Sequence, residues 1–213
     1  MSMTARKGRL EVITGSMFSG KTEELMYRLR RAEYAKKKVI TIKHEIDNRK
    51  SYSCIVSHDG GLREAFPLGS CEEGLKTLVK LIDPAVDVIG IDEIQFFPDQ
   101  AVQVLQLLVE HGKRVIVAGL DMDFRGEPFG IVPTLMALAD EVVKSRAICV
   151  VCGDEANFTQ RLINDKPARY DDPTIMVGGA ECYEARCRGC YAIDKKDYLD
   201  IGNQLTLSGK RED

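Results

Sequence analysis

The stretch that decides the fold covers residues 15–22 and reads Gly15-Ser16-Met17-Phe18-Ser19-Gly20-Lys21-Thr22. Its spacing of two glycines, a lysine and a threonine is that of a phosphate-binding loop, which joins a strand to a helix. The flanks agree, because the apolar run 10–14 predicts a strand and residues 23–35 carry apolar side chains at helical spacing. Such a turn directs backbone N–H groups and the positive end of a helix dipole at a polyphosphate. We therefore expect residues 15–22 to bind a nucleoside triphosphate.

Two side chains of this loop have specific expected roles. Lys21 would reach the β- and γ-phosphates, and the hydroxyl of Thr22 would bind Mg²⁺. A glycine-rich turn that only begins a helix is the alternative. The eight matched positions between a strand and a helix disfavour it.

Length and composition limit the class of protein. A chain of 213 residues suits one domain with a small appendage. The 30 basic residues are balanced by 33 acidic ones, for a net charge of −3, so no basic excess indicates a nucleic-acid partner. No apolar stretch approaches the roughly 20 residues of a membrane span, and residues 1–8 lack the apolar run of a signal peptide. Seven cysteines beside a nucleotide-binding motif indicate reduced thiols, and hence a cytoplasmic protein.

Strands and helices alternate along the first two thirds of the chain. Apolar, β-branched runs predict further strands at 39–43, 86–91, 114–119 and 141–147, with a short one at 54–57. Helical spacing predicts helices at 74–82, 100–111 and 133–139. This alternation predicts an α/β fold, in which a parallel sheet carries helices on both faces and binds its ligands at the carboxyl ends of the strands.

The composition divides the chain into three parts. Cysteine and glycine replace the alternating strands and helices near residue 148. We expect an ATP-binding domain over residues 1–147, a zinc-binding domain over residues 148–195 and a partly disordered tail over residues 196–213.

An acidic pair, Asp92 and Glu93, directly follows the strand expected at 86–91. In a phosphate-loop protein an aspartate at this position holds the Mg²⁺ shell. Glu93 could then act as a base on the hydroxyl or water that attacks the γ-phosphate. The alternative is that both are simply acids at a strand end. Gln95 could orient a nucleophile or bond to the backbone, and the sequence leaves both roles open.

The last third of the chain contains two C-x-x-C pairs. Their four cysteines are Cys149, Cys152, Cys187 and Cys190. Two such pairs complete a closed tetrahedral zinc shell, which makes the ion structural because no coordination position stays open. The 34 residues between the pairs exceed the usual spacing of small zinc ribbons, so we expect residues 153–186 to form a long loop tied at its base. Disulfides are the rival interpretation, which a reducing compartment disfavours.

These features leave three classes of function open. The first is a kinase for a small acceptor. The second is an ATPase or a nucleic-acid-handling module, since a phosphate loop, an acidic strand end and a zinc ribbon also occur together there. The third is a zinc-stabilised interaction domain with a decayed ATP site. The balanced charge favours the kinase, because a nucleic-acid binder would normally carry a basic groove.

Four motifs together resemble the cellular-type (type II) thymidine kinases, and their order and spacing are similar to the bacterial members. The motifs are residues 15–22, Ile91-Asp92-Glu93-Ile94-Gln95-Phe96-Phe97, Gly119-Leu120-Asp121-Met122-Asp123-Phe124 with Pro128-Phe129-Gly130, and the two cysteine pairs. The resemblance covers residues 8–191. It implies a RecA-like parallel sheet with a zinc-tethered lasso loop, a homotetramer, and feedback inhibition by dTTP. The implied reaction transfers the γ-phosphate of ATP to the 5′-hydroxyl of thymidine, and also of deoxyuridine, in nucleotide salvage.

The resemblance also implies roles for individual residues. Glu93 matches the general base that takes the proton of the 5′-hydroxyl. The residues implied to bind ATP and Mg²⁺ are Gly15, Ser16, Met17, Phe18, Ser19, Gly20, Lys21, Thr22, Asp47, Arg49, Asp92, Glu93, Ile94 and Gln95. The residues implied to bind thymidine are Met17, Leu120, Phe124, Thr174, Ile175, Met176, Val177, Gly178 and Tyr183.

Three points qualify this resemblance. Phe124 matches the aromatic that stacks on thymine, although without the resemblance it would be interpreted as a core residue. Lys50 stands where relatives often carry an aromatic residue. The three histidines match no family role, and we expect them to face solvent or to cap helices; they are His44, His58 and His111.

Overall fold

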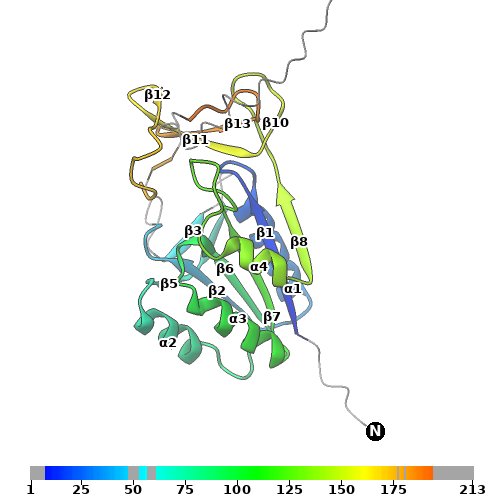
Figure 1. The fold of residues 1–213 in the computed structure, drawn as a ribbon. Coiled ribbons are helices and arrows are strands. Elements are labelled where there is room, and N and C mark those ends of the chain that lie inside the picture. Colours follow the sequence, from blue (N-terminus) through cyan, green and yellow to red (C-terminus); the bar gives the residue numbers. More distant parts are fainter. Residues whose placement is uncertain (1–7, 48–52, 57–60, 177, 180, 194–213) are drawn as a thin grey trace, which may run out of the picture.

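The computed structural model describes residues 8–47, 53–56, 61–176, 178–179 and 181–193. At its centre is a six-stranded sheet in which every paired neighbour runs parallel. In spatial order its strands are β5 (Phe66–Leu68), β2 (Val39–His44), β6 (Val88–Asp92), β7 (Arg114–Gly119), β1 (Arg9–Gly15) and β8 (Glu141–Ser145). The carboxyl ends of β1, β2, β6 and β7 therefore meet at one edge of the sheet, below the second region in Figure 1.

Helices cover both faces of this sheet, which confirms the expected α/β fold. They are α1 (Lys21–Tyr34), α2 (Glu72–Leu81), α3 (Gln100–Glu110) and α4 (Val132–Leu138). Leu10 and Val12 of β1 face the core shared with α2, α3 and α4, whereas Ile13 faces the core shared with α1. Alternate residues of one strand thus pack against the helices on opposite faces of the sheet, as the pleat of a strand requires. A short 3₁₀ helix, η1 (Ile94–Phe96), follows β6.

The helix α1 lies close to the sheet because β6 carries glycine at position 90. A Cβ atom there would be 2.5 Å from Cδ1 of Leu29, a distance that real side chains do not tolerate. The close approach lets α1 pack Leu25, Met26 and Leu29 against the strands, all of them buried.

A second, smaller region follows β8 and is antiparallel. Its strands are β9 (Ala147–Ile148), β10 (Glu155–Ala156), β11 (Phe158–Ile163), β12 (Lys166–Pro167) and β13 (Tyr183–Arg186). β9 pairs with β10, and β11 is the middle strand between β12 and β13. Figure 1 shows this region beyond the carboxyl ends of the parallel strands.

One expectation about the fold was wrong, and two short strands were missed. Residues 153–186 are not one long loop, because β10, β11, β12 and β13 occupy both its ends; between β12 and β13 lies the loop at 168–182, which the structure describes except at 177 and 180. The short strand expected at 54–57 is β3 (Cys54–Val56), but the sequence analysis missed its hairpin partner β4 (Leu62–Glu64) and the edge strand β5. These strands have three residues each, and β5 contains a proline, which restricts it to the edge of the sheet.

The described helices contain no segment that combines the length and the apolar character needed to cross a membrane. The expected tail at 196–213 lies outside the described residues.

A buried carboxylate ties β1 to its neighbours on the α1 face. Glu11 is fully buried and accepts hydrogen bonds from Arg28 of α1 at 2.6 Å and from Arg114 of β7 at 2.7 and 3.0 Å. Burial alone raises the pKa of Glu11, but the hydrogen bonds and charges of Arg114 and Arg28 outweigh it and lower the pKa below its ordinary value of 4.5. The ionised form is therefore part of the folded state.

We predict that Glu11→Gln destabilises the protein, because it leaves two arginines without their buried anion. The free energy of unfolding should fall by about 2 kcal/mol at pH 7. This loss is smaller than for a fully buried ion pair, because Arg114 is partly exposed. Since the pKa of Glu11 is depressed in the folded state, this stabilisation is complete above its unfolded value and disappears as the pH falls through its folded value. Thermal unfolding of the wild type and of Glu11→Gln, followed between pH 3 and pH 7, measures this loss of stability. Glu110→Gln, on the exposed end of α3, is the control, and an equal loss in both variants would contradict the prediction.

Candidate active site

The phosphate-binding loop joins β1 to α1, as the sequence predicted. Gly15 adopts a φ of 139°, and a Cβ atom there would be 2.2 Å from the carbonyl oxygen of Ser145, so only glycine fits. Lys21 folds back over the loop, and its Nζ donates to the carbonyl oxygen of Ser16 at 2.6 Å. A lysine held in this way already lies where a polyphosphate would enter the loop.

The second region contacts this loop directly. The hydroxyl of Ser16 donates to the carbonyl oxygen of Ala156 at 3.3 Å, and the N–H of Met17 donates to Oγ1 of Thr159 at 3.0 Å. The loop is thus shaped by both regions of the chain.

Asp92 lies opposite the loop, at the end of β6. Its Oδ2 accepts a hydrogen bond from the hydroxyl of Thr22 at 3.0 Å, and its Oδ1 accepts one from the N–H of Glu93 at 3.0 Å. Burial, with a smaller effect of the Glu93 charge, raises the pKa of Asp92 to about 7. Two facing oxygens, one of them on a carboxylate whose charge is costly to bury, fit a divalent cation, which prefers oxygen ligands and would offset that cost.

Glu93 is held in one position by its backbone and by Gln95. Its φ is 55°, a left-handed conformation that side-chain-bearing residues rarely adopt and that concentrates at functional sites. Its Oε2 accepts a hydrogen bond from Nε2 of Gln95 at 2.6 Å, and Oε1 of Gln95 accepts the N–H of Leu120 at 3.1 Å. Of the two roles that the sequence left open for Gln95, the structure shows the bond to the backbone; the bond that also holds Glu93 was not predicted.

One cavity of about 660 Å³ lies between the two regions. Most of the expected site residues line it: Met17, Phe18, Ser19, Gly20, Lys21, Thr22, Asp47, Asp92, Glu93, Gln95, Leu120, Phe124, Thr174, Ile175, Met176, Gly178 and Tyr183. Gly15 and Ser16 lie beside it in the phosphate-binding loop. Ile94 is fully buried in the hydrophobic core, so its side chain faces away from the cavity. Arg49 and Val177 lie outside the described residues.

Phe124 enters the cavity from a tight turn after β7. The turn is closed by the N–H of Asp123, which donates to the carbonyl oxygen of Glu127 at 2.9 Å, and by the carboxylate of Asp123, which accepts the N–H of Arg125 at 2.8 Å. The hydroxyl of Tyr191, just past the last cysteine pair, donates to the carbonyl oxygen of Phe124 at 2.7 Å. The ring is therefore placed by contacts from both regions.

The loop at 168–182 forms the opposite wall. Thr174, Ile175, Met176 and Gly178 line the cavity from this loop. The hydroxyl of Tyr183 donates to the carbonyl oxygen of Met176 at 2.7 Å. This bond fixes the loop backbone next to the cavity.

Several cavity residues were missed by the sequence analysis. Lys43 is almost fully buried; its Nζ donates to the carbonyl oxygen of Cys54 at 3.0 Å and lies 3.6 Å from Oδ2 of Asp47. In the sequence, Lys43 could have been found as a charged residue inside an otherwise apolar strand. In the sheet, it is paired in register with Asp92 of β6. Thr159 was missed because nothing local to β11 marks it.

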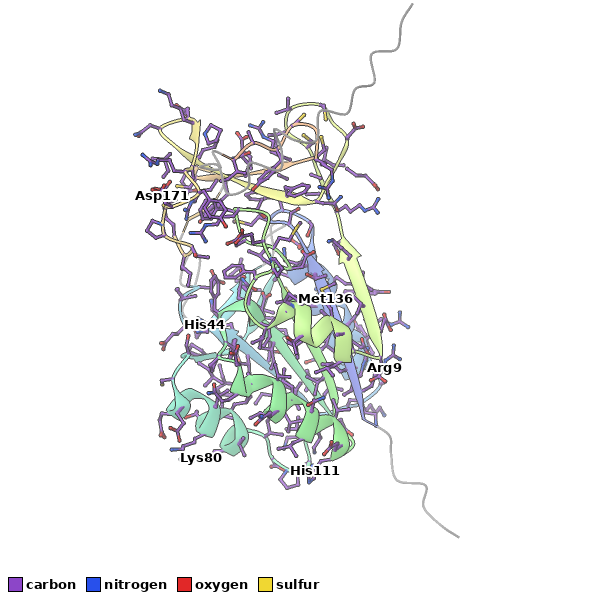
Figure 2. All side chains as sticks on the ribbon, in the orientation of Figure 1. Arg9, His44, Lys80, His111, Met136 and Asp171 are labelled. Carbon is purple, nitrogen blue, oxygen red and sulfur yellow. The ribbon has the colours of Figure 1, made fainter. Side chains whose placement is uncertain are left out.

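His44 does not face solvent, so that expectation was wrong. It is buried inside the molecule, whereas His111 lies exposed at the end of α3 and contacts the carbonyl oxygen of Leu107, as expected of a capping residue (Figure 2). Nδ1 of His44 accepts the N–H of Ile46 at 3.2 Å, so Nε2 carries the proton toward Oγ of Ser70 at 2.7 Å. Burial lowers the pKa of His44, which keeps the ring neutral.

The four cysteines of the two C-x-x-C pairs meet in the second region. Their sulfur atoms all lie within 4.8 Å of one another. Zinc–sulfur bonds of about 2.3 Å place tetrahedral ligands about 3.8 Å apart, so the four thiols fit one metal ion. Burial alone raises the pKa of Cys149, but backbone N–H groups of Cys187, Cys152 and Val151 bring it to about 6, whereas neighbouring thiols raise the pKa of Cys152 and of Cys190.

Comparison with known proteins gives a family match over most of the chain. A family model described as thymidine kinase matches residues 8–191. A thymidine kinase of Coprothermobacter proteolyticus is 58% identical over 187 residues, which cover 88% of this chain and 92% of that protein.

Solved structures give only distant similarity. A DNA replication initiation factor aligns with 64% of this chain and 40% of its own, at 15% identity and a TM-score of 0.41. AMPPCP-bound DnaA from Aquifex aeolicus aligns with 63% of this chain and 39% of its own, at 16% identity and a TM-score of 0.38. Scores this low carry no argument about the present chain.

We predict that the protein purified without chelator contains one zinc ion and that Cys187→Ser loses most of it, because an incomplete thiolate shell binds weakly. The parallel sheet should stay folded, since its two hydrophobic clusters are built from other residues. Elemental analysis and circular dichroism measure the two outcomes. Cys71→Ser, at an exposed position that begins α2, is the matched control and should keep its zinc. Wild-type protein without zinc, or an unchanged zinc content in Cys187→Ser, would contradict the prediction.

Proposed function

The chain belongs to the thymidine kinase family, and from this membership we propose how its own residues carry out the reaction. The activity is that of an ATP-dependent phosphotransferase acting on thymidine. The observation that carries the residue assignments is that one cavity is lined by the phosphate-binding loop, the acidic pair and Phe124 together. A donor and an acceptor bound in one cavity can react without an intermediate carrier.

The triphosphate binds at the β1 end of the cavity. Residues 15–22 surround the phosphates with backbone N–H groups, and Lys21 exchanges its bond to Ser16 for the phosphate oxygens. Thr22 and Asp92 would hold Mg²⁺, and Asp47 lines the same cavity; Arg49 is assigned to the triphosphate from the family resemblance alone. When bound, the ion would neutralise the charge that develops on the phosphates. The side chain of Ile94 takes no part, and Gln95 acts through Glu93.

The nucleoside binds at the other end of the cavity. Phe124 stacks on the base, while Met17, Leu120 and Tyr183 lie around it. The loop residues Thr174, Ile175, Met176, Val177 and Gly178 read the base edge through their backbone, which explains why their side chains have no shared chemistry. The hydrogen bond from Tyr183 to Met176 supports this, because it fixes that backbone.

Glu93 is the general base of the transfer. Its carboxylate takes the proton of the 5′-hydroxyl as that oxygen attacks the γ-phosphorus in line and the bond to ADP breaks. Glu93 supplies the acceptor, and the strained backbone together with Gln95 keeps it at one position. A base that needs no reorientation loses no free energy to ordering in the transition state.

Further properties are proposed from the family resemblance. They are a structural Zn²⁺ on the four cysteines, deoxyuridine as a second substrate, a role in nucleotide salvage, inhibition by dTTP, a homotetramer and a cytoplasmic location. The exposed side chains of Tyr27 and Tyr34 on α1, and of Val142 on the edge strand β8, support an assembly of several copies.

We predict that Glu93→Gln lowers kcat by about 10²–10⁴, because the amide keeps the shape of the side chain but accepts no proton. ATP binding should survive. Steady-state kinetics and an ATP-binding isotherm measure both. Glu45→Gln, an exposed glutamate at the end of β2, is the control. Turnover close to wild type in Glu93→Gln would remove Glu93 from the role of base.

The proposed function itself is tested by incubating the protein with Mg-ATP and each nucleoside and detecting the 5′-monophosphate. We predict thymidine as the best substrate and deoxyuridine next, since one methyl group is worth only about 1–3 kcal/mol. The kcat/KM for deoxycytidine should be about 10⁴ lower than for thymidine, because cytosine leaves buried polar groups unpaired. Purine nucleosides should clash with the walls of the cavity. A best substrate other than thymidine would contradict the base assignment. Phosphorylation of no nucleoside, with ATP hydrolysis stimulated by DNA, would support the ATPase alternative.

A further inference from the structure

Arg125 holds three successive parts of the loop at 168–182. Its Nε donates to the carbonyl oxygen of Tyr170, its Nη2 to that of Asp172 and its Nη1 to Oγ1 of Thr174, each at 2.6 Å. Asp123, 3.1 Å from Nη1, supplies the counter-charge. One guanidinium thus connects the turn that carries Phe124 with the loop on the opposite wall.

Arg161 makes a second connection between the same two elements. Its side chain is 1% exposed, and its Nη1 donates to the carbonyl oxygen of Pro173 at 2.6 Å. Its Cζ lies 3.5 Å from the centre of the Phe124 ring. Because the hydrogens at a ring edge prevent so close an approach in the plane, the guanidinium lies on one face of the ring.

The other two side-chain nitrogens of Arg161 explain why the guanidinium lies against the ring. Within the described part of the chain, Nε and Nη2 are buried and have no oxygen or nitrogen acceptor. Burying such donors is costly unless another partner replaces water. The π face of Phe124 is that partner, so Arg161 is committed to the ring.

We propose that Arg125 and Arg161 are positioning residues that lock the loop segment 170–174 to Phe124, and so set the affinity and selectivity for the nucleoside. The proposal rests on the proposed function, in which Phe124 and the adjoining loop residues hold the base. Arg161 covers one face of Phe124, and Cζ of Arg125 lies 4.8 Å from the centre of the same ring, so both arginines contact the side chain that is proposed to hold the base. The two arginines therefore fix the distance between the ring and the backbone that reads the base edge.

This arrangement predicts an effect on one substrate and not on the other. A loop without its anchors samples other conformations, and nucleoside binding must then select the competent one, which lowers the apparent affinity. ATP binds at the phosphate-binding loop, and the hydrogen bonds of this loop to Ala156 and Thr159, like the bond of Lys21 to Ser16, involve neither arginine. Loss of an anchor should therefore raise KM for thymidine while KM for ATP stays near its wild-type value.

The shape of the guanidinium, and not its charge alone, is required. Arg125 serves three acceptors at once through a planar set of donors, which the single ammonium of lysine cannot reproduce. Arg125→Lys should therefore behave like Arg125→Met. At position 161 a lysine could still lie over the ring, so Arg161→Lys should restore part of what Arg161→Met loses.

The experiment measures kcat and both KM values for these four variants, with zinc content as a check on folding. We expect KM for thymidine to rise about tenfold or more in both methionine variants, with KM for ATP changed by less than about threefold. The preference of the enzyme for thymidine over deoxycytidine should also decrease. Arg169→Met, an exposed arginine of the same loop, is the matched control and should leave the kinetics unchanged. Unchanged KM for thymidine in both methionine variants, or full rescue by Arg125→Lys, would overturn the proposal.

Two further measurements separate this proposal from the proposed function. If Phe124→Leu leaves KM for thymidine unchanged, the assignment of Phe124 to the base fails, and the present proposal fails with it. If Phe124→Leu impairs thymidine binding but the arginine variants do not, only the present proposal fails. Hydrogen exchange of residues 168–176 gives a readout independent of activity. It should become severalfold faster in Arg125→Met and stay constant in α3, and unchanged exchange in the loop would contradict the proposed lock.

Discussion

The common direction of the six sheet strands is the constraint on which the active site depends. Because the strands are parallel, the phosphate-binding loop after β1, the acidic pair after β6 and the turn bearing Phe124 after β7 all begin at one edge of the sheet. No long connection is needed to bring them together. The buried Glu11, which binds arginines from α1 and β7, helps to hold that sheet on the α1 face.

The antiparallel region completes the cavity that the sheet begins. It contacts the phosphate-binding loop through Ala156 and Thr159, and it holds the Phe124 turn through Tyr191. The cysteine cluster is next to Tyr191 in sequence, and Phe18 of the phosphate-binding loop packs in the same hydrophobic cluster as Cys149. A metal there would stabilise the walls of the cavity through these contacts.

Much of the fold and most of the site could be predicted, because their signals are local. Continuous valine and isoleucine runs gave the long strands to within a few residues, and the cysteine spacing gave the metal cluster. The rest depends on partners distant in sequence. Gln95 takes its role from Leu120, the buried charge of Lys43 depends on Cys54 and Asp47, and residues 158–161 of β11 pair with the distant β13. Ile94 differs from its neighbours in the motif, because its side chain points into the core.

The central claim is that one cavity holds donor and acceptor for a single direct transfer, with Glu93 as a proton acceptor and not a carrier of the phosphoryl group. The stereochemistry of that transfer tests it most directly. ATP made chiral at the γ-phosphorus with oxygen isotopes is reacted with thymidine, and the configuration of the product phosphate is determined. The account predicts inversion, because one in-line displacement inverts phosphorus. Retention, which requires two displacements and hence a phosphorylated enzyme, would contradict it.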